Sequence, residues 1–342
     1  MDLVLLDERL KARGEPSFRF RQVWSWIAAG AASFAEMTSL PVALRDSLAE
    51  EVPFSSLAAV EEALARDGTE KVLFGTSDGR PVEAVLMRYH DGRLSLCLSS
   101  QSGCPLTCTF CATGRMKFGR NLSESEILDQ ALHFRRSNAV NHAVFMGMGE
   151  PLMNLDNVLA ACERLPDIGI ATSNTAISTV GWLPGIERLA REGPPVRLAL
   201  SLHAPDEALR SALMPVNDRY PLRDVLGACV RWHARRKRQV FVEYLMLDGV
   251  NDRYEQAMAL ADLLQPRLAF KVNLIPYNDI GPPRASSRPP VRDPTEAGFR
   301  GSGREAIAAF RSALEGRGVR TTVRLTRGRD IDAACGQLAA RG

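Results

Sequence analysis

Apolar residues recur with two different periods along the chain. Near the N-terminus they repeat every three or four positions, as at Phe20, Val23 and Trp24 and again at Leu40 and Leu44, which predicts a small helical unit. From residue 70 to 98, short runs typical of strands are separated by turns that contain Asp and Gly. We therefore expect a helical domain over residues 1–52, a lead-in β segment over 53–92 and a larger α/β domain over 93–342.

Strands and helices alternate in the larger domain. Ser123 and Glu126 have the spacing of a capping box, which begins a helix that continues to Phe134. The strands expected after it are 143–146, 171–178, 196–202, 240–247, 270–275 and 319–323, and the helices between them are 158–165, 183–191, 222–235, 254–264 and 304–314. About six βα units with right-handed crossovers give an α/β fold whose parallel sheet curls into a partial or full barrel. A long Pro- and Ser-rich loop is expected over 281–303.

Polar and reactive residues follow the predicted strands. They are the cysteine loop 104–111, the turn 147–150, Ser178, His203, the turn 248–252 and Asn278. The carboxyl ends of parallel strands meet on one face, where barrel enzymes keep their active sites. We expect these six loops to form one site.

The cysteine loop suggests the chemistry of that site. Cys104, Cys108 and Cys111 are spaced Cys-x3-Cys-x2-Cys. A structural zinc site has four protein ligands, whereas three thiolates on a cubane iron–sulfur cluster leave one iron open to a substrate or cofactor. A zinc knuckle with a distant fourth ligand and cysteines buried as small apolar residues are the alternatives.

Composition limits the remaining choices. The chain has no apolar run that could span a bilayer and no leader-like N-terminus, so we expect a cytoplasmic protein that binds no membrane. Seven cysteines suit ligation and thiol chemistry better than a disulfide framework. The net charge is only +3, but basic runs at 231–238 and 317–329 could contact RNA phosphates. A solvated helix or strand face explains either run equally well.

Single residues give weaker signals. Glu150, in a turn with two glycines, could hold an ammonium group, but a solvated turn is the simpler interpretation. A lone His203 is more often structural than catalytic, and Asn278 has the donor and acceptor that a ribose or carboxylate contact needs. Cys335 lies near the end of the chain, where it could fold over the barrel mouth. Cys97 precedes the cysteine loop and could equally be a core residue.

Cys162 and Cys229 lie inside helical patterns, and we interpret both as core residues.

Taken together, these residues resemble the radical S-adenosylmethionine (SAM) adenosine methyltransferases of the RlmN/Cfr type. The resemblance covers nearly the whole chain, including residues 18–27, 99–101, 147–151, 178–179, 201–205, 244–252, 273–278 and 330–338. It implies that Cys104, Cys108 and Cys111 hold a [4Fe-4S] cluster whose open iron is chelated by SAM. The residues that fall where the family binds SAM are Gly149, Glu150, Ser178, Ser201, Leu202, His203 and Asn278.

The resemblance also implies catalytic roles for the lone thiols. Cys335 would take a methyl group from one SAM, and a 5′-deoxyadenosyl radical from a second SAM would remove a hydrogen from that methyl. The carbon radical would add to an adenine carbon, which joins protein and RNA. Cys97 would then attack the Cys335 sulfur and release the methylated base through a transient disulfide, with Glu83 as the general base.

The resemblance further implies partners and domain roles. Domain 1–52 would help to bind RNA, and domain 93–342 would be the catalytic domain that ends in the catalytic-cysteine segment. The substrate would be 23S rRNA, with tRNA as a second substrate left open. An electron donor such as flavodoxin would reduce the cluster, and we expect a monomer.

The target carbon is less clearly marked. Pro151 after Glu150 resembles the RlmN branch, which favours carbon 2, whereas residues 213–221 resemble the Cfr branch and carbon 8 of 23S rRNA. Another radical SAM reaction would leave Cys97 and Cys335 without a role. If the chain were a non-catalytic RNA-binding protein stapled by a metal, the six loops at the strand ends would have no role.

Overall fold

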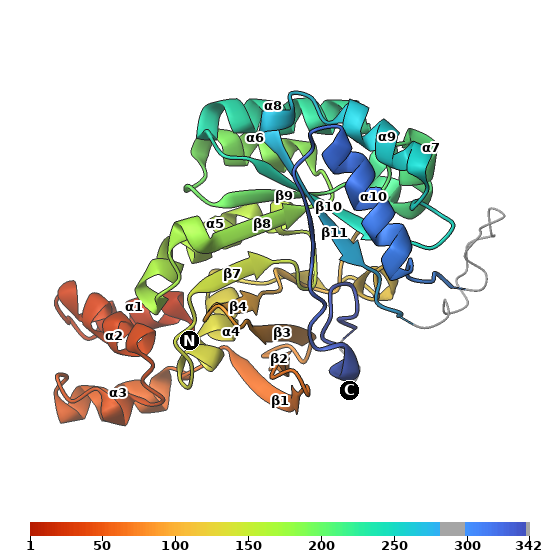
Figure 1. Ribbon diagram of the computed structural model, residues 1–342. Helices are drawn as coiled ribbons and strands as arrows, with labels where there is room; N and C mark the ends of the chain where they lie inside the picture. The colour runs from red at the N-terminus through yellow and green to blue at the C-terminus, as the bar shows by residue number, and fades with distance from the viewer. Residues whose placement is uncertain (281–297, 340–342) are drawn as a thin grey trace.

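The computed structural model describes residues 1–280 and 298–339. Within these residues ten strands form one sheet in the order β1-β2-β3-β4-β7-β8-β9-β10-β11-β12. Figure 1 shows the sheet as a curved surface with helices along its outer side. The strands are β1 (Leu57–Leu64), β2 (Glu70–Thr76), β3 (Pro81–Arg88), β4 (Leu94–Cys97), β7 (His142–Phe145), β8 (Thr175–Thr179), β9 (Arg197–Ser201), β10 (Val240–Met246), β11 (Phe270–Pro276) and β12 (Thr321–Val323). A separate antiparallel pair consists of β5 (Gln101–Ser102) and β6 (Arg120–Asn121).

Strand direction divides the sheet into two parts. Strands β1 to β4 are antiparallel neighbours, whereas β4 and β7 to β12 run parallel. The helices that connect the parallel strands are α4 (Glu124–Arg135), α5 (Leu155–Arg164), α6 (Leu183–Glu192), α7 (Glu207–Leu213), α8 (Leu222–Arg236), α9 (Tyr254–Leu263) and α10 (Arg304–Gly316). The described chain therefore contains the six expected βα units, and the predicted α/β partial barrel is confirmed.

Side chains alternate in direction along the strands, so that one set faces the hydrophobic core and the other faces the concave side of the sheet. Ile177, Leu198 and Leu200 are buried in the hydrophobic core, whereas Ser178 and Ser201 line a cavity on the concave side. Strands β8 and β9 thus present apolar side chains to the helices and a serine to the barrel interior.

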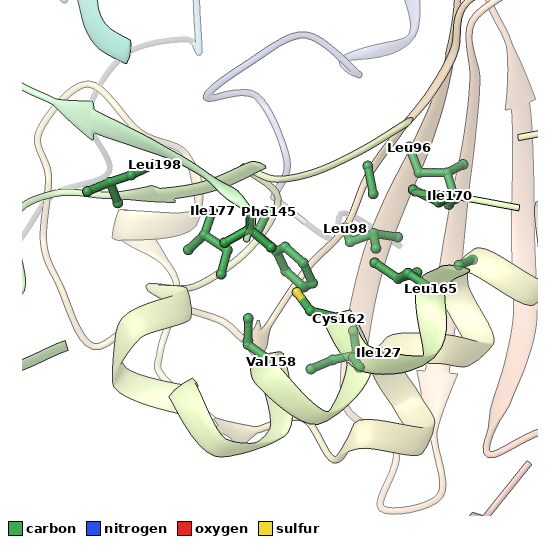
Figure 2. Packing of buried hydrophobic residues seen from close by; sticks show 14 of the residues in the cluster. Leu96, Leu98, Ile127, Phe145, Val158, Cys162, Leu165, Ile170, Ile177 and Leu198 are labelled. Carbon is green, nitrogen blue, oxygen red and sulfur yellow. The ribbon is translucent and has the colours of Figure 1, made fainter. Parts of the chain in front are cut away.

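Helix α5 shows how this core is packed. Figure 2 shows Cys162 and Val158 of α5 beside Phe145 of β7 and Ile177 of β8. Cys162 is fully buried, as is Cys229 of α8, so the prediction that both are core residues is confirmed. The capping box of Ser123 and Glu126 is also present at the start of α4.

The N-terminal region consists of α1 (Leu3–Ala12), α2 (Phe18–Ala29) and α3 (Val42–Glu51), as the helical pattern predicts. Helix α2 packs against α4 and the turn that follows α5. There, Trp24 Nε1 donates a hydrogen bond of 2.7 Å to Asp167, and the Arg164 guanidinium lies over the Trp24 ring. These contacts join the helices to the barrel, and the domain boundaries at 52 and 92 stay predictions.

The sequence-based strands were incomplete in one place and wrong in another. Strand β1 lies within the expected β segment 53–92, but no individual strand was assigned there, because its Ala and Glu residues favour helix and most of its side chains are exposed. Its strand conformation depends on the pairing with β2. The strand expected from Ala171 begins only at Thr175, because residues Thr172–Asn174 form a 3₁₀ turn.

Two further expectations concern the loop and the membrane. Of the long loop expected over 281–303, residues 281–297 lie outside the described residues. In the remainder of the chain, no helix combines the length and the apolar character needed to cross a membrane.

Candidate active site

The cysteine loop is the part of the chain between β5 and β6, and contacts from distant segments fix its conformation. The backbone N–H of Thr109 donates to the carbonyl of Leu213 at the end of α7 (3.0 Å). The N–H of Ala112 donates to the carbonyl of Gly336 in the C-terminal segment (2.8 Å). The loop is therefore held between a βα connection and the end of the described chain.

A cavity of about 130 Å³ opens at the carboxyl ends of the parallel strands. Cys104, Cys108 and Cys111 line it. Five of the predicted cofactor-binding residues line the same cavity: Gly149, Glu150, Ser178, Ser201 and His203. The structure brings these residues together, and the roles assigned to them stay predictions.

Burial disfavours the ionised form of the loop thiols. It raises the pKa of Cys104 to about 12 and that of Cys108 well above its usual range, and the charge of Glu150 acts in the same direction. Bound iron would supply the positive charge that stabilises thiolates at such a site. The ionisation of these side chains is therefore expected to accompany metal binding.

The number and placement of the three loop thiols also fit an iron–sulfur cluster. All seven cysteines of the chain are free thiols. In residues 1–280 and 298–339, no group of three or more His, Cys, Asp or Glu side chains is placed to hold a metal ion as a common ligand set. Cluster ligands bind different irons, so they need not converge on one point. The donor set fits three-thiolate ligation of a [4Fe-4S] cluster with one iron left for SAM.

The turn after β7 places Glu150 against the next strand end. Oε1 of Glu150 accepts from Leu152 N–H and Oε2 from Val180 N–H, both at 3.0 Å. Burial nevertheless raises the pKa of Glu150 to about 7, because these two hydrogen bonds only partly offset the loss of water. An ammonium group next to this carboxyl would favour its ionised form.

Gly149 allows this turn to pass close to β5. Its φ is +96°, and a Cβ there would lie 2.5 Å from Cβ of Gln101. Oε1 of Gln101 accepts a hydrogen bond of 2.8 Å from Glu150 N–H. The close approach of Gly149 to Gln101 therefore also helps to position Glu150.

His203 is a buried, neutral donor. Its φ is +60°, and its Nδ1 accepts a hydrogen bond of 3.0 Å from Leu245 N–H, so the neutral ring carries its proton on Nε2. Burial lowers the pKa of His203 to about 3, and the nearby Arg210 acts in the same direction. The Phe110 ring contacts the imidazole edge-on at 4.7 Å between centroids. Asn251 donates to the His203 carbonyl at 2.7 Å, so the turn 248–252 supports the site from behind.

Cys335 connects this cavity to a second one. It lines the main cavity and also a smaller cavity of about 30 Å³, where Cys97 and Arg324 are neighbours. Burial raises the pKa of Cys335, and the Arg324 guanidinium partly opposes this shift. Burial and the charge of Cys335 raise the pKa of Cys97 to about 12. The two lone thiols are therefore brought together in a site with a half-buried cation, Arg324.

Three other predicted site residues lie outside the lining of the main cavity. Glu83 lies outside the linings of both cavities; it pairs with Lys71 at 3.1 Å and accepts a hydrogen bond of 2.9 Å from Ala339 N–H. Leu202 is buried in the core, because strand alternation turns it away from the cavity that Ser201 and His203 line.

Asn278 lines the smaller cavity rather than the main one. Its Nδ2 donates a hydrogen bond of 3.3 Å to the Cys335 carbonyl, and its Oδ1 accepts from Arg329. In this structure Asn278 therefore helps to hold the C-terminal segment.

Sequence reasoning missed two charged residues of the site. Glu243 lines the main cavity from β10, and Arg210 is fully buried in α7. Each occupies one position in an ordinary strand or helix pattern, so only the tertiary structure reveals it. Arg324 was considered only as part of the basic run 317–329, whereas the structure places it beside Cys335.

The fold and the three cysteines at the strand ends define a radical SAM enzyme. The family model of the Radical SAM superfamily matches residues 98–261. The model "Ribosomal RNA large subunit methyltransferase N-terminal domain" matches residues 1–53. Proteins of the Radical SAM superfamily use a [4Fe-4S] cluster and SAM, and these are the cofactors of this enzyme.

Curated relatives and a solved structure cover the whole chain. "Dual-specificity RNA methyltransferase RlmN" of Pelobacter propionicus is 41% identical, over 100% of this chain and 95% of the relative. "Probable dual-specificity RNA methyltransferase RlmN" of Gemmatimonas aurantiaca is 46% identical, over 98% of this chain and 90% of the relative. The crystal structure of a radical SAM methyltransferase from Sphaerobacter thermophilus matches with a TM-score of 0.89 and 40% identity, and covers 100% of this chain and 98% of that one. The chain belongs to the RlmN family of radical SAM RNA methyltransferases.

Proposed function

We propose that this enzyme methylates an aromatic carbon of an adenosine in RNA, with carbon 2 as the favoured position, through a methyl group carried on Cys335. The observation that carries the proposal is that Cys335 lines both cavities. One cavity is lined by Cys104, Cys108 and Cys111 and the other by Cys97, and this arrangement supports a role for the Cys335 sulfur in both steps.

SAM bound at the cluster would supply a methyl group and the radical that activates it. The chain supplies the nucleophile, because a thiol accepts a methyl group by polar transfer far more readily than an adenine carbon does. Arg324 favours the thiolate of Cys335, which is the reactive form. Under this proposal Cys104, Cys108 and Cys111 ligate the cluster, and Gly149, Glu150, Ser178, Ser201, Leu202, His203 and Asn278 contact SAM.

Release of the product requires the second thiol. Glu83 is assigned as the base that takes the proton from the adenine carbon after the radical has added, and the electron left on the base would pass to the cluster. The Cys97 thiolate then attacks the sulfur of Cys335: a disulfide forms, the bond from that sulfur to the methylene carbon breaks, and the carbon takes up a proton to become the methyl group of the released base. In the structure the Glu83 carboxylate is held by Lys71 and the Ala339 amide, so its role as the base requires the end of the chain to release it when RNA binds.

The proposed substrate is 23S rRNA, and the dual-specificity name of the relatives supports tRNA as a second substrate. The N-terminal module, which matches a ribosomal RNA methyltransferase domain, would help to hold the RNA. We further propose a cytoplasmic monomer that receives electrons from a flavodoxin-like donor, and the domain limits 52 and 92 given above.

Carbon 8 is the second candidate position. Pro151 follows Glu150 in the turn beside the cavity, as in the carbon-2 branch, whereas residues 213–221 resemble the carbon-8 branch. A radical adds to whichever carbon is held within reach, so the orientation of the base decides the position. RNA treated with reduced enzyme and SAM is digested, and the methyladenosine isomers are separated by chromatography with mass detection. We expect 2-methyladenosine, and a product dominated by 8-methyladenosine would reverse the assignment.

A further inference from the structure

Arg210 is a buried cation that neither the sequence motifs nor the proposed mechanism uses. It lies on α7, and none of its surface is exposed. Burial lowers its pKa to about 10, which still leaves the guanidinium charged at neutral pH. A charge in such a place is retained only when strong hydrogen bonds compensate its desolvation.

Those hydrogen bonds go to the ends of two neighbouring strands. Nη2 of Arg210 donates to the carbonyl of Val180, just beyond β8, at 2.7 Å. The same nitrogen donates to the carbonyl of Ser201, the last residue of β9, at 3.3 Å. One guanidinium nitrogen therefore connects the two strand ends that bring Ser178 and Ser201 to the cavity.

The connection extends to Glu150. The Val180 peptide donates its N–H to Glu150 Oε2 at 3.0 Å while its carbonyl accepts from Arg210. Both bonds involve an ionisable group, and charge-assisted hydrogen bonds are stronger than neutral ones. Arg210, the Val180 peptide and Glu150 thus form a continuous chain of hydrogen bonds across three βα loops.

The other side of the guanidinium is held as well. Nη1 of Arg210 donates to Asn217 Oδ1, and Asn217 Nδ2 donates to Glu207 Oε2 at 2.7 Å. Glu207 is the first residue of α7, so these hydrogen bonds hold the Arg210 guanidinium against the start of its own helix. With Nη1 held by Asn217, the planar guanidinium directs Nη2 at both carbonyls.

We propose that Arg210 is the positioning residue of the SAM site: by tying the Val180 and Ser201 carbonyls together, it sets the spacing of the Ser178, Ser201 and Glu150 side chains and so the affinity for SAM. The inference rests on the proposed assignment of these side chains to SAM binding. It concerns SAM binding alone, so it does not depend on RNA, on the target carbon or on Cys335.

Arg236 provides a matched control. Its Nη2 also bridges two backbone carbonyls, those of Leu189 at 2.9 Å and Gly193 at 2.6 Å. As with Arg210, its Nε is buried without a hydrogen-bond partner among the described residues. The carbonyls that it bridges lie at the end of α6 and outside the cavity lining, so Arg236 can contribute to stability without affecting SAM.

The test measures SAM dissociation constants by calorimetry on anaerobically reconstituted Arg210→Met, Arg210→Lys and Arg236→Met, with iron content, circular dichroism and melting temperature recorded for each. We expect Arg210→Met to weaken SAM binding by about tenfold or more at wild-type iron content, and Arg236→Met to change it by less than about twofold even if its melting temperature falls. Arg210→Lys keeps the charge but not the fork, so its SAM affinity should lie between that of the wild type and that of Arg210→Met.

Two further readouts separate positioning from general stability. Amide hydrogen exchange of the protein without SAM should show faster exchange over residues 178–182 in Arg210→Met and unchanged exchange there in Arg236→Met. Steady-state kinetics of Arg210→Lys should show a raised KM for SAM with a nearly unchanged kcat. If Arg210→Met is unfolded, the Lys variant alone decides the question.

Unchanged SAM affinity in a folded Arg210 variant, or an equal loss in Arg236→Met, would overturn the inference. The methyl-carrier role of Cys335 is tested separately, by peptide mass spectrometry of the wild-type protein, so the two proposals can fail independently.

Discussion

Replacing Gly149 by Ala tests how the turn beside the cavity is built. The residue has a φ of +96°, where an L-residue costs about 1–2 kcal/mol. The new Cβ would lie 2.5 Å from Cβ and 2.7 Å from Oε1 of Gln101, and a Cβ cannot move aside without its backbone. We therefore expect the hydrogen bond from Glu150 N–H to Gln101 to break.

The size of the effect follows from these two contributions. A buried N–H left without its partner costs about 1–3 kcal/mol. Together with the backbone term this gives a loss of about 2–5 kcal/mol in the free energy of unfolding. Because Glu150 is displaced, SAM binding should weaken in the same variant.

Gly92, in the turn between β3 and β4, is the matched control for this prediction. Its φ is +81°, and an added Cβ there would meet no atom within 4 Å. Gly92→Ala should therefore lose only the backbone term of about 1–2 kcal/mol and keep its SAM affinity, because Gly92 lies outside the cavity lining. Anaerobic urea unfolding and calorimetric titration with SAM compare the two variants. Equal stability losses with unchanged SAM binding in both would refute the steric argument.

Two further predictions concern the cysteines. Changing Cys104, Cys108 or Cys111 to Ala should in each case lower the iron content and abolish SAM cleavage after anaerobic reconstitution, because under the proposed assignment each thiolate would hold one iron. Cleavage that survives in any variant would contradict the ligand assignment. Cys97→Ala should still form the covalent bond between Cys335 and RNA but not resolve it, so a protein–RNA species should accumulate on denaturing gels. Release of methylated RNA at the normal rate would make Cys97 a packing residue.

The fold was predictable from the sequence where the local pattern of apolar residues matches the secondary structure that the tertiary contacts require. Parallel strands with apolar side chains on the helix side, such as β8 and β9, alternate with helices, of which α4 begins at a recognisable capping box, and this alternation predicts the six βα units. The bounds of strand β1 within the expected β segment 53–92 were not predictable, because several of its residues (Leu57–Leu64) favour helix and the pairing with β2 imposes the extended form.

The residues of the site likewise divide into those that a sequence motif reveals and those that only the structure reveals. The cysteine loop and the turn of Glu150 have recognisable motifs, because their chemistry requires particular residues at fixed spacing. Arg210 and Glu243 have no such signal, since one is a single polar position in a short helix and the other a single acid in an apolar strand. The residues around Arg210 and Glu243 belong to segments that are distant in the sequence, and a local sequence pattern does not show which distant segments come together.

Leu202 illustrates a case that alternation could have settled. Ser201 and His203 line the cavity, so the residue between them must face the core, as it does. A contact between Leu202 and SAM would therefore involve its backbone rather than its side chain.

The central claim, that the methyl group passes through Cys335 before it reaches RNA, can be tested with SAM carrying a fully deuterated methyl group. If the methyl is first placed on Cys335 and then loses one hydrogen before it adds to adenine, the methyladenosine must contain two deuterium atoms and one protium. Peptide mass spectrometry should find the fully deuterated methyl group on Cys335 before RNA is added. A methyladenosine that keeps all three deuterium atoms, with Cys335 unmodified throughout turnover, would show direct transfer and contradict the account.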